Sequence, residues 1–401
     1  MNQPLTDKLF AGLRVLDLTR VMSGPFCTAM LADLGAEIIK VELPNSGDDS
    51  RYFAPHVNGE STYFALLNRG KRSITINMKT PEGIGLIRDL AKKADVLVEN
   101  FRPGVMERLG LGYEVLKADN PRMIYASISG FGQQGPLADL PAFDLVIQAM
   151  SGLMSVTGEP GGRALAVGES VADVTTGMFA AWGIAAALYD RERTGEGRRL
   201  EVAMLDSVFS MLLTSLSRRL FTDQRTRRVG NRHPETYPVD SLSTKSGDIV
   251  LAGFSEAIVK RIFEAIGRPD LSADPRFKTN RDRNTHEAEL REILAGWASQ
   301  LTQDEALAAL RAAEVPAAPV WTLDDMLESE HVAERQLLVP GHNAKLGDIK
   351  FAPQPVRFAP ASQPQQKIRA PTLGEDTDAI LRDELGLDDD RIAALRAART
   401  V

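Results

Sequence analysis

Short apolar runs alternate with amphipathic stretches through the first 130 residues of this chain. Five runs have the length and β-branched content of buried strands; they span 13–19, 36–42, 73–77, 95–99 and 123–127. Between them, 25–34 and 81–93 show helical periodicity; Gly35 ends the first, and Pro81 opens the second, where the missing proline N–H is harmless. This alternation predicts an α/β fold with a parallel, helix-covered, Rossmann-like sheet.

Three loops follow predicted strands at their carboxyl ends. They span 20–25, 100–104 and 129–136. Ligands of such sheets bind at this edge, where loops and helix starts present backbone N–H groups. We therefore expect the three loops to lie together around a site.

The remaining pattern predicts a second, smaller domain. A long helix covers about 172–193 and ends at 194–197, and another runs from 204 to 221. The polar segment 222–238 reads as a linker. Beyond it we expect a strand at 248–252, helices at 255–266, 286–300 and 302–313, and a terminal helix from 388. The predicted domains are a large Rossmann-like domain at 1–222, a small α+β domain at 223–328, and a C-terminal segment at 329–401 that returns to the large domain.

Composition and charge narrow the class of protein. The chain has 401 residues, of which 43% are hydrophobic and 25% charged, so it is globular and long enough for two domains. Its net charge of −7 argues against a nucleic-acid partner. The start, 1–8, lacks a secretory signal pattern, and no apolar run reaches membrane-spanning length, so we expect a cytoplasmic protein without a membrane partner. The single cysteine, Cys27, lies in an apolar helical pattern and is interpreted as a buried, inert thiol.

Several common enzyme motifs are missing. No dinucleotide fingerprint, phosphate-binding loop or serine-nucleophile elbow occurs in the chain. The five histidines show no paired spacing suited to a metal, so no metal site is expected. They are His56, His233, His286, His331 and His342. His233 lies in a Gly/Pro turn at 230–234 and is the one histidine kept as a candidate site residue.

Asp173 is the most informative residue. It is a lone acid near the start of an apolar helix that follows a glycine-containing loop, 167–170. Such an aspartate commonly caps a helix, because its side chain accepts hydrogen bonds from free N–H groups. The same carboxylate also suits nucleophilic attack on an activated acyl group. The two roles can belong to one residue.

Other candidates are weaker when taken alone. The backbone of Gly130 and Gly132 could stabilise an oxyanion, because glycine lets the chain approach a ligand closely. Arg102 and Arg108 flank a predicted helix start, where they either bind phosphate or remain solvated surface arginines. Arg20 either anchors a distal carboxylate through its guanidinium fork or forms an ordinary ion pair.

Taken together, five ordered segments resemble the class III coenzyme A transferases, the carnitine dehydratase and bile-acid-inducible type. The segments are 16–25, 34–42, 68–74, 98–104 and 129–132, and the likeness extends from about residue 11 to the end. Among the members of this family, the chain most resembles the succinyl-CoA:glutarate type in its sequence motifs. The family also includes formyl-CoA and carnitine CoA-transferases.

The resemblance implies roles for many of these residues. Asp173 would be the catalytic aspartate, and 1–222 would be the coenzyme A-binding domain. Coenzyme A contacts map onto Met22, Ser23, Leu43, Ile76, Asn77, Met78, Lys79, Asn100, Phe101, Arg102 and Arg108. It also implies a homodimer of two interlocked rings and an acyl-CoA and a small carboxylic acid as substrates.

The sequence departs from two branches of this fold. Formyl-CoA transferase has a glutamine where Met22 stands and a glycine-rich loop where 253–256 stands, which argues against formate or oxalate as substrate. The α-methylacyl-CoA racemases need a proton-shuttling histidine before an aspartate. Here Phe143 precedes Asp144, and phenylalanine cannot exchange a proton.

The resulting hypothesis is transfer of coenzyme A between two carboxylic acids through a mixed anhydride and an aspartyl-CoA thioester at Asp173, with a dicarboxylate favoured. Two alternatives stay open. They are a racemase or isomerase of the same fold and an acyl-CoA-binding protein without catalysis.

Overall fold

The computed structural model describes residues 9–358 and 368–401. The stretch 1–8, where the sequence argued against a secretory signal, lies outside the described residues. The chain divides into two compact units. The first comprises Met1–Leu153, Val167–Met211 and Ala333–Val401, and the second comprises Met154–Ala166 and Leu212–Val332.

The core of the first unit is a six-stranded sheet in which every neighbouring pair is parallel. In spatial order its strands are β5 (Lys71–Thr75), β2 (Glu37–Glu42), β1 (Arg14–Asp17), β6 (Val96–Glu99), β7 (Ile124–Ser129) and β8 (Arg199–Ala203). The predicted parallel α/β sheet is confirmed, and the five predicted runs form five of its strands. The sixth strand, β8, was not predicted.

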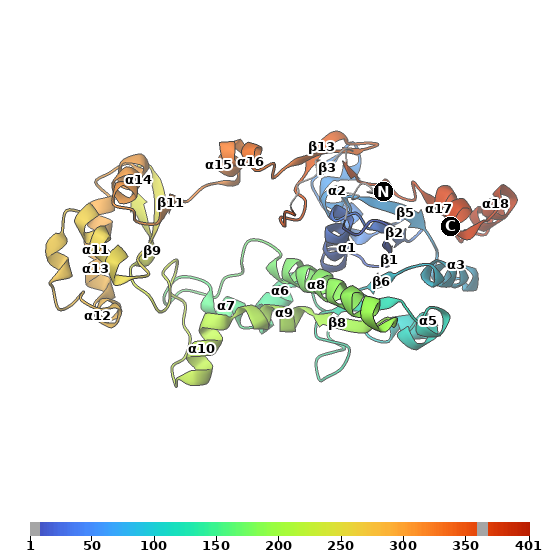
Figure 1. The fold of residues 1–401 in the computed structure, drawn as a ribbon, viewed down its shortest axis with the longest axis horizontal. Coiled ribbons are helices and arrows are strands. Elements are labelled where there is room, and N and C mark those ends of the chain that lie inside the picture. Colours follow the sequence, from blue (N-terminus) through green and yellow to red (C-terminus); the bar gives the residue numbers. More distant parts are fainter. Residues whose placement is uncertain (1–8, 359–367) are drawn as a thin grey trace. The chain divides into compact units, whose positions relative to one another are not determined.

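Helices cover both faces of this sheet (Figure 1). Residues adjacent along a strand point to opposite faces, so Val15 packs in one core cluster and Leu16 in another. One cluster joins the sheet to α1 (Ser23–Asp33) and α8 (Val171–Thr194). The other joins it to α3 (Pro81–Lys92), α4 (Val105–Arg108), α5 (Tyr113–Asp119), α17 (Thr377–Leu385) and α18 (Asp389–Ala397). The buried position of Cys27 in the first cluster is confirmed, and burial holds the pKa of its thiol well above the usual range.

Helix α8 packs unusually closely on α1. A Cβ added to Gly177 would lie 2.7 Å from the carbonyl oxygen of Ser23 and 3.0 Å from the Phe26 ring. Because Asp173 lies four residues before Gly177, it shares the helix face that approaches Ser23. Among the described residues α8 is the one helix long and apolar enough to cross a membrane, and half of that stretch is buried within the protein. Its apolar character is therefore used in part for packing on the sheet.

Short elements complete the first unit and its junctions. They are η1 (Asp49–Tyr52), β3 (His56–Val57), β4 (Glu60–Ser61), α2 (Thr62–Leu67), α6 (Asp144–Met150), α7 (Leu153–Val156), α9 (Met204–Met211), α16 (Glu330–Glu334), β12 (Val339–Asn343), β13 (Gly347–Phe351) and β14 (Ile368–Arg369). The predicted helix 204–221 is wrong in one respect. The chain leaves helical geometry at Leu212, so α9 and α10 (Leu213–Phe221) are separate helices, and Leu212 is also where the chain passes between the units.

The C-terminal part of the chain binds the edge strand β5. The N–H of Ser73 donates to the Asp376 carboxylate at 2.9 Å, and the N–H of Thr75 donates to the Thr377 hydroxyl at 3.1 Å. These contacts use donors on the open edge of the sheet, which would otherwise be exposed. The predicted terminal helix is confirmed as α18, with Asp388 as its capping residue.

The second unit is built around an antiparallel sheet with the order β11 (Ala317–Pro319), β10 (Gly247–Ala252) and β9 (Val239–Thr244). Its helical elements are α10, α11 (Glu256–Ala265), η2 (Pro269–Ser272), α12 (Asn280–Thr285), α13 (Glu287–Ala298), α14 (Gln303–Ala312) and α15 (Leu323–Glu328). Leu251, Ile262, Leu294 and Leu310 are among its core residues. The predicted strand and three predicted helices of this region are confirmed within two residues at each end.

The close packing of α1 on α8 gives a first testable prediction. Gly177→Ala places a methyl group against the Ser23 carbonyl, so we expect the free energy of unfolding to fall by about 1–3 kcal/mol. Gly183→Ala is a matched control in the same helix, because its Cβ would meet only Leu200, at 3.6 Å. We expect that variant to be unchanged or more stable by up to about 1 kcal/mol. Urea unfolding of both variants measures the difference, and equal stabilities would refute the close-packing account.

Candidate active site

The sheet reverses its strand order between β1 and β6. The chain moves from β1 outward to β2 and β5 and then returns to the other side of β1 to form β6. In parallel sheets ligands bind at such a reversal, beyond the carboxyl ends of the strands. The loops after β1 and β6 line a cleft of about 320 Å³ at this point, together with residues 128–130 at the end of β7. The predicted clustering of the three loops is confirmed.

Asp173 lies in this cleft, in the first turn of α8. Burial, and after it the nearby Asp144 carboxylate, raise the pKa of its carboxyl to about 6, although hydrogen bonds from the Ser23 hydroxyl and the Ser23 N–H act in the opposite direction. Ser23 is the first residue of α1, so its N–H is one of the free donors at that helix N-terminus. Asp173 therefore accepts hydrogen bonds at the start of α1, across the contact between the two helices.

The start of α8 is bound by a different carboxylate. Oδ1 of Asp144 accepts the N–H of Ala172 at 2.7 Å and the N–H of Asp173 at 3.2 Å. The interpretation of Asp173 as the cap of its own helix is therefore wrong. Because Asp144 fills that role, the Asp173 carboxylate is directed to Ser23 and the cleft.

The loop after β1 is held in a strained conformation. Val21 has a φ of 70°, which a β-branched residue rarely adopts. Its N–H donates to Asp48 at 3.0 Å. The side-chain amide of Asn100 accepts from the Arg20 N–H and donates to the Arg20 carbonyl oxygen, both at 2.8 Å. These contacts fix the loops after β1 and β6 to each other and set the position of Ser23.

Buried ion pairs support this loop from below. Lys71 Nζ contacts Asp17 at 2.9 Å, and Lys40 Nζ contacts Asp48 at 2.8 Å, with all four side chains almost fully buried. Burial opposes ionisation of Asp17, but Lys71 and Lys40 together hold its pKa well below the usual range. The Thr19 carbonyl oxygen accepts from Lys40, and the Pro25 carbonyl oxygen accepts from Lys71. The network thus anchors the loop backbone on both sides of Ser23.

The structure brings eight of the predicted site residues to the cleft and leaves the others elsewhere. Those that line the cleft are Arg20, Met22, Ser23, Asn100, Phe101, Arg102, Gly130 and Asp173. Leu43 follows β2, and Ile76, Asn77, Met78 and Lys79 follow β5. Because β5, β2, β1 and β6 are successive neighbours, these residues lie along the same carboxyl edge of the sheet as the cleft. Arg108 is exposed at the end of α4.

Some predicted residues have other contacts in the structure. The Nη2 atom of Arg20 pairs with the Asp49 carboxylate, and both side chains are about half exposed. The Gly132 N–H donates to the Ser129 hydroxyl at 3.0 Å, whereas Gly130 lines the cleft. His233 belongs to the second unit, where its Nδ1 accepts the N–H groups of Glu235 and Thr236 at 3.2 and 3.0 Å.

Tyr63 and Asp144 contact the site and were not predicted to belong to it. Tyr63 of α2 donates its hydroxyl to the sulfur of Met22 at 2.9 Å. Burial raises the pKa of the Tyr63 phenol, and so does the negative charge of the nearby Asp173. Asp144 was noted only as the residue after Phe143. Sequence gave no sign of either contact, because both join segments far apart along the chain.

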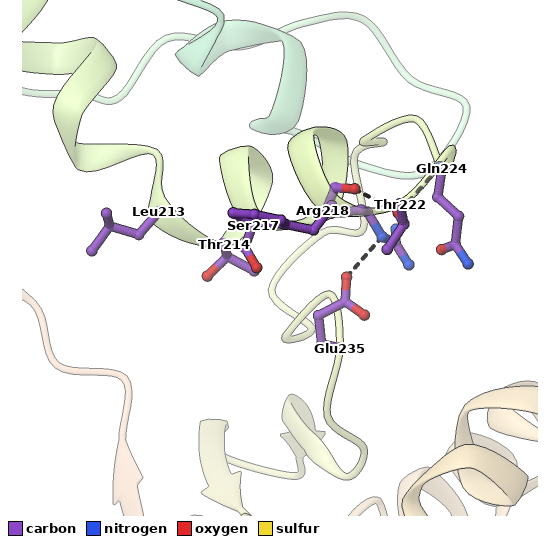
Figure 2. Close-up of a pocket in the computed structure, with 8 residues that line it drawn as sticks. Leu213, Thr214, Ser217, Arg218, Thr222, Gln224 and Glu235 are labelled. Carbon is purple, nitrogen blue, oxygen red and sulfur yellow. Dashed lines mark hydrogen bonds and ion pairs between the residues drawn. The ribbon is translucent and has the colours of Figure 1, made fainter.

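A larger hollow, of about 520 Å³, lies in the second unit between α10 and the segment that follows it. Figure 2 shows the ion pair of Arg218 with Glu235, 2.8 Å apart, at its edge. None of the predicted site residues line it. Within 9–358 and 368–401, no group of three or more His, Cys, Asp or Glu residues is placed to hold a metal ion. Asp173 lines the smaller cleft, at the edge of the sheet.

Comparison with known proteins gives consistent matches over nearly the whole chain. The profile of CoA-transferase family III matches residues 10–377. An acetyl-CoA:oxalate CoA-transferase of Acetobacter aceti is 40% identical over 93% of this chain and 95% of its own. A succinate–glutarate CoA-transferase of Agrobacterium fabrum is 39% identical over 84% and 86%. The crystal structure of a CAIB/BAIF family protein from Brucella suis has a TM-score of 0.83 at 36% identity, covering 94% of this chain and 99% of that one.

The raised pKa of Asp173 predicts a cost in stability. Because the folded-state pKa of about 6 lies above the ordinary value of 3.8, the protonated carboxyl stabilises the fold at low pH. That stabilisation is lost as the pH rises through 6. We therefore expect Asp173→Asn to increase the free energy of unfolding at pH 8 by about 1–3 kcal/mol.

Urea unfolding between pH 5 and pH 8 measures this effect, and the gain should shrink as the pH falls. Asp139→Asn removes an exposed carboxylate from a nearby loop and should change stability by no more than about 0.5 kcal/mol at any pH. A gain for Asp173→Asn that is independent of pH, or a loss of stability at pH 8, would contradict the burial of an ionised carboxylate.

Proposed function

This chain belongs to CoA-transferase family III, and we propose that Asp173 carries its reaction as the covalent nucleophile. The observation that supports this role most directly is the position of the Asp173 carboxyl, which has a raised pKa and faces the cleft at the strand-order reversal. A carboxyl with a pKa near 6 is roughly 90% ionised at pH 7 and is more basic than an ordinary aspartate. It can therefore attack a thioester at neutral pH.

The proposed reaction has four bond exchanges. The Asp173 carboxylate attacks the thioester carbonyl, the C–S bond breaks, and a mixed anhydride and the coenzyme A thiolate result. The thiolate attacks the aspartyl carbonyl, which releases the donor acid and leaves an aspartyl-CoA thioester. The acceptor carboxylate displaces the thiolate to form a second anhydride. The thiolate then attacks the acceptor acyl carbon, which gives the new acyl-CoA and restores Asp173.

Each exchange passes through an oxyanion that needs a hydrogen-bond donor. The Ser23 N–H already binds the Asp173 carboxyl and is suited to an oxyanion on the aspartyl carbon. Gly130 lines the cleft and is our candidate on the acyl side. Gly132 is the second candidate on the acyl side, once its N–H leaves Ser129. We keep His233 as a further substrate contact, although it belongs to the second unit.

For coenzyme A we propose binding along the carboxyl edge of the sheet. A 320 Å³ cleft accommodates the acyl end, so the rest of this long molecule must extend beyond it. The residues after β6, β1, β2 and β5 follow one another along this edge, in that order. Arg102, Arg108 and Lys79 are exposed cations suited to its phosphates. Met22, Ser23, Leu43, Ile76, Asn77, Met78, Asn100 and Phe101 complete the proposed contacts.

For the acids we propose a dicarboxylate as one partner. The relatives act on oxalate, glutarate and, in a Chloroflexus aurantiacus enzyme 36% identical over the whole of this chain and 98% of its own, D-citramalate. The sequence argued against oxalate as a substrate, but the relative from Acetobacter aceti is an oxalate CoA-transferase. Oxalate therefore belongs among the acceptors to be tested. Arg20 lines the cleft and has further guanidinium donors besides Nη2 for a distal carboxylate.

We also propose a homodimer and a cytoplasmic location. The exposed side of α8 carries Met178, Phe179, Trp182 and Tyr189, and Trp182 and Tyr189 are each 70% exposed. An apolar helix face of this kind is typical of a protein interface and supports the proposed dimer. The molar mass in solution, compared with 43.7 kDa for one chain, tests the dimer. The single, buried cysteine is compatible with a reducing compartment, and cell fractionation tests the location.

Trapping of the intermediate tests the nucleophile. We expect incubation with succinyl-CoA followed by hydroxylamine to convert Asp173 to its hydroxamate, detected by peptide mass spectrometry. Asp173→Asn should abolish the adduct and lower kcat by about a thousandfold or more. Glu169→Gln neutralises a neighbouring carboxylate and should still form the adduct. Transfer that survives in Asp173→Asn would show that the proposed mechanism is wrong.

The same incubation separates the two alternatives. A racemase would wash deuterium into the α-carbon of a chiral acyl-CoA without exchange of coenzyme A, and a non-catalytic binder would leave the thioester unaltered. Phe143 lines the cleft where the racemases need a histidine, so no proton acceptor stands at that position.

The proposed role of Arg20 predicts a change in acid selectivity. We expect Arg20→Gln to raise KM for succinate or glutarate about tenfold, because one charge-assisted contact is lost, and to leave KM for a monocarboxylate nearly unchanged. Arg88→Gln, which removes an exposed arginine paired with Asp119, is the matched control. An equal rise in KM for both acid classes would assign Arg20 to some other role.

A further inference from the structure

Asp144 makes three contacts that together define one position for the start of α8. Oδ1 accepts the N–H groups of Ala172 and Asp173, and Oδ2 accepts from Gln148 Nε2 at 2.5 Å. Gln148 is 1% exposed and is itself fixed. Its Nε2 also donates to the Glu169 carbonyl oxygen at 3.3 Å, and its Oε1 accepts the Val167 N–H at 2.8 Å. The segment before the proposed nucleophile is therefore held at both ends by one Asp–Gln pair.

We propose that Asp144 is a positioning residue for the nucleophile, because its carboxylate fixes the backbone of Ala172 and Asp173 and keeps a second negative charge beside the Asp173 carboxylate. This inference rests on the proposed function of Asp173. In this proposal Asp144 acts on the reaction only through Asp173 and does not contact the reacting atoms.

The geometry explains why an acid stands at this position. A neutral capping side chain would satisfy the same N–H groups, and capping by Ser, Thr or Asn is common. A carboxylate also suits the positive end of α8. Asp144 thus places its negative charge against the backbone N–H of Asp173, where it opposes ionisation of the Asp173 carboxyl.

No cation among the described residues offsets this charge at Asp173. The groups that act on it are Asp144 from α6 and Ser23 from α1, and the Tyr63 hydroxyl from α2 lies nearby. Of these only Ser23 favours the ionised form, whereas burial and Asp144 oppose it. A carboxylate held in this way is more basic, and attack on a thioester benefits from basicity as long as the group stays ionised at the working pH.

The test is the pH dependence of kcat/KM for coenzyme A transfer in variants that keep a hydrogen-bond acceptor but lose the charge. In the wild type we expect the acidic limb to fall near pH 6. Asp144→Asn keeps an oxygen for the two N–H groups, and we expect this limb to move to lower pH by about half a pH unit or more. Asp144→Ser is the second neutral variant, because serine caps well and sets no amide against Gln148.

Three further variants make the result decisive. Glu169→Gln removes a neighbouring charge that does not hold α8, and its acidic limb should stay within about 0.2 pH units of the wild type. Asp144→Glu retains the charge, so its acidic limb should stay near that of the wild type. Asp144→Ala removes the acceptor and should lower both kcat and the melting temperature.

An unshifted limb in either folded neutral variant would overturn the proposal, as would an equal shift in Glu169→Gln. Either result would leave the proposed function standing, because that function depends on Asp173. Transfer retained in Asp173→Asn would instead refute the nucleophile itself.

Discussion

The close approach of α1 to α8 is the constraint on which the site depends. Gly177 has no side chain, so the first turn of α1 can reach α8 within a distance that a methyl group would block. One turn earlier on the same face, Asp173 meets the free N–H and the hydroxyl of Ser23. A helix N-terminus attracts negative charge, which partly offsets the cost of burying this carboxylate. The packing of the two helices and the position of Asp173, the proposed nucleophile, are therefore set by the same contact.

Two groups of buried charges surround this contact, one made of ion pairs and the other of neighbouring carboxylates. Below the loop that carries Ser23, Asp17 pairs with Lys71 and Asp48 pairs with Lys40, so those buried carboxylates are stabilised as anions. Beside the cleft, Asp173 is paired with no cation from the described part of the chain, and it faces Asp144. The paired charges give the loop a fixed shape despite the strained backbone at Val21. The Asp173 carboxyl, in contrast, has a raised pKa, and shifted pKa values are common among groups in active sites.

Much of this arrangement was predictable from the sequence because it follows from local patterns. Apolar runs of strand length, Gly35 and Pro81 gave the parallel sheet, and the rule that ligands bind beyond strand ends gave the three loops of the cleft. Asp173 stood out as an acid in an apolar helix. The capping role was misassigned, because Asp144 reaches the start of α8 from 29 residues earlier. Tyr63, Asp48 and Lys71 were missed for the same reason. Lys40 and Lys71, which are charged residues in apolar strands, were the one available signal of the buried network.

Oxygen labelling tests the central claim most directly, because the proposed bond exchanges move one atom from the acceptor acid into Asp173. With an acceptor labelled with ¹⁸O in its carboxylate, the account predicts one ¹⁸O in the peptide that contains Asp173 after a single turnover. The product thioester should have lost the same atom. If all of the ¹⁸O were found in the product acyl group or in the solvent and none in Asp173, a covalent role for this residue would be contradicted.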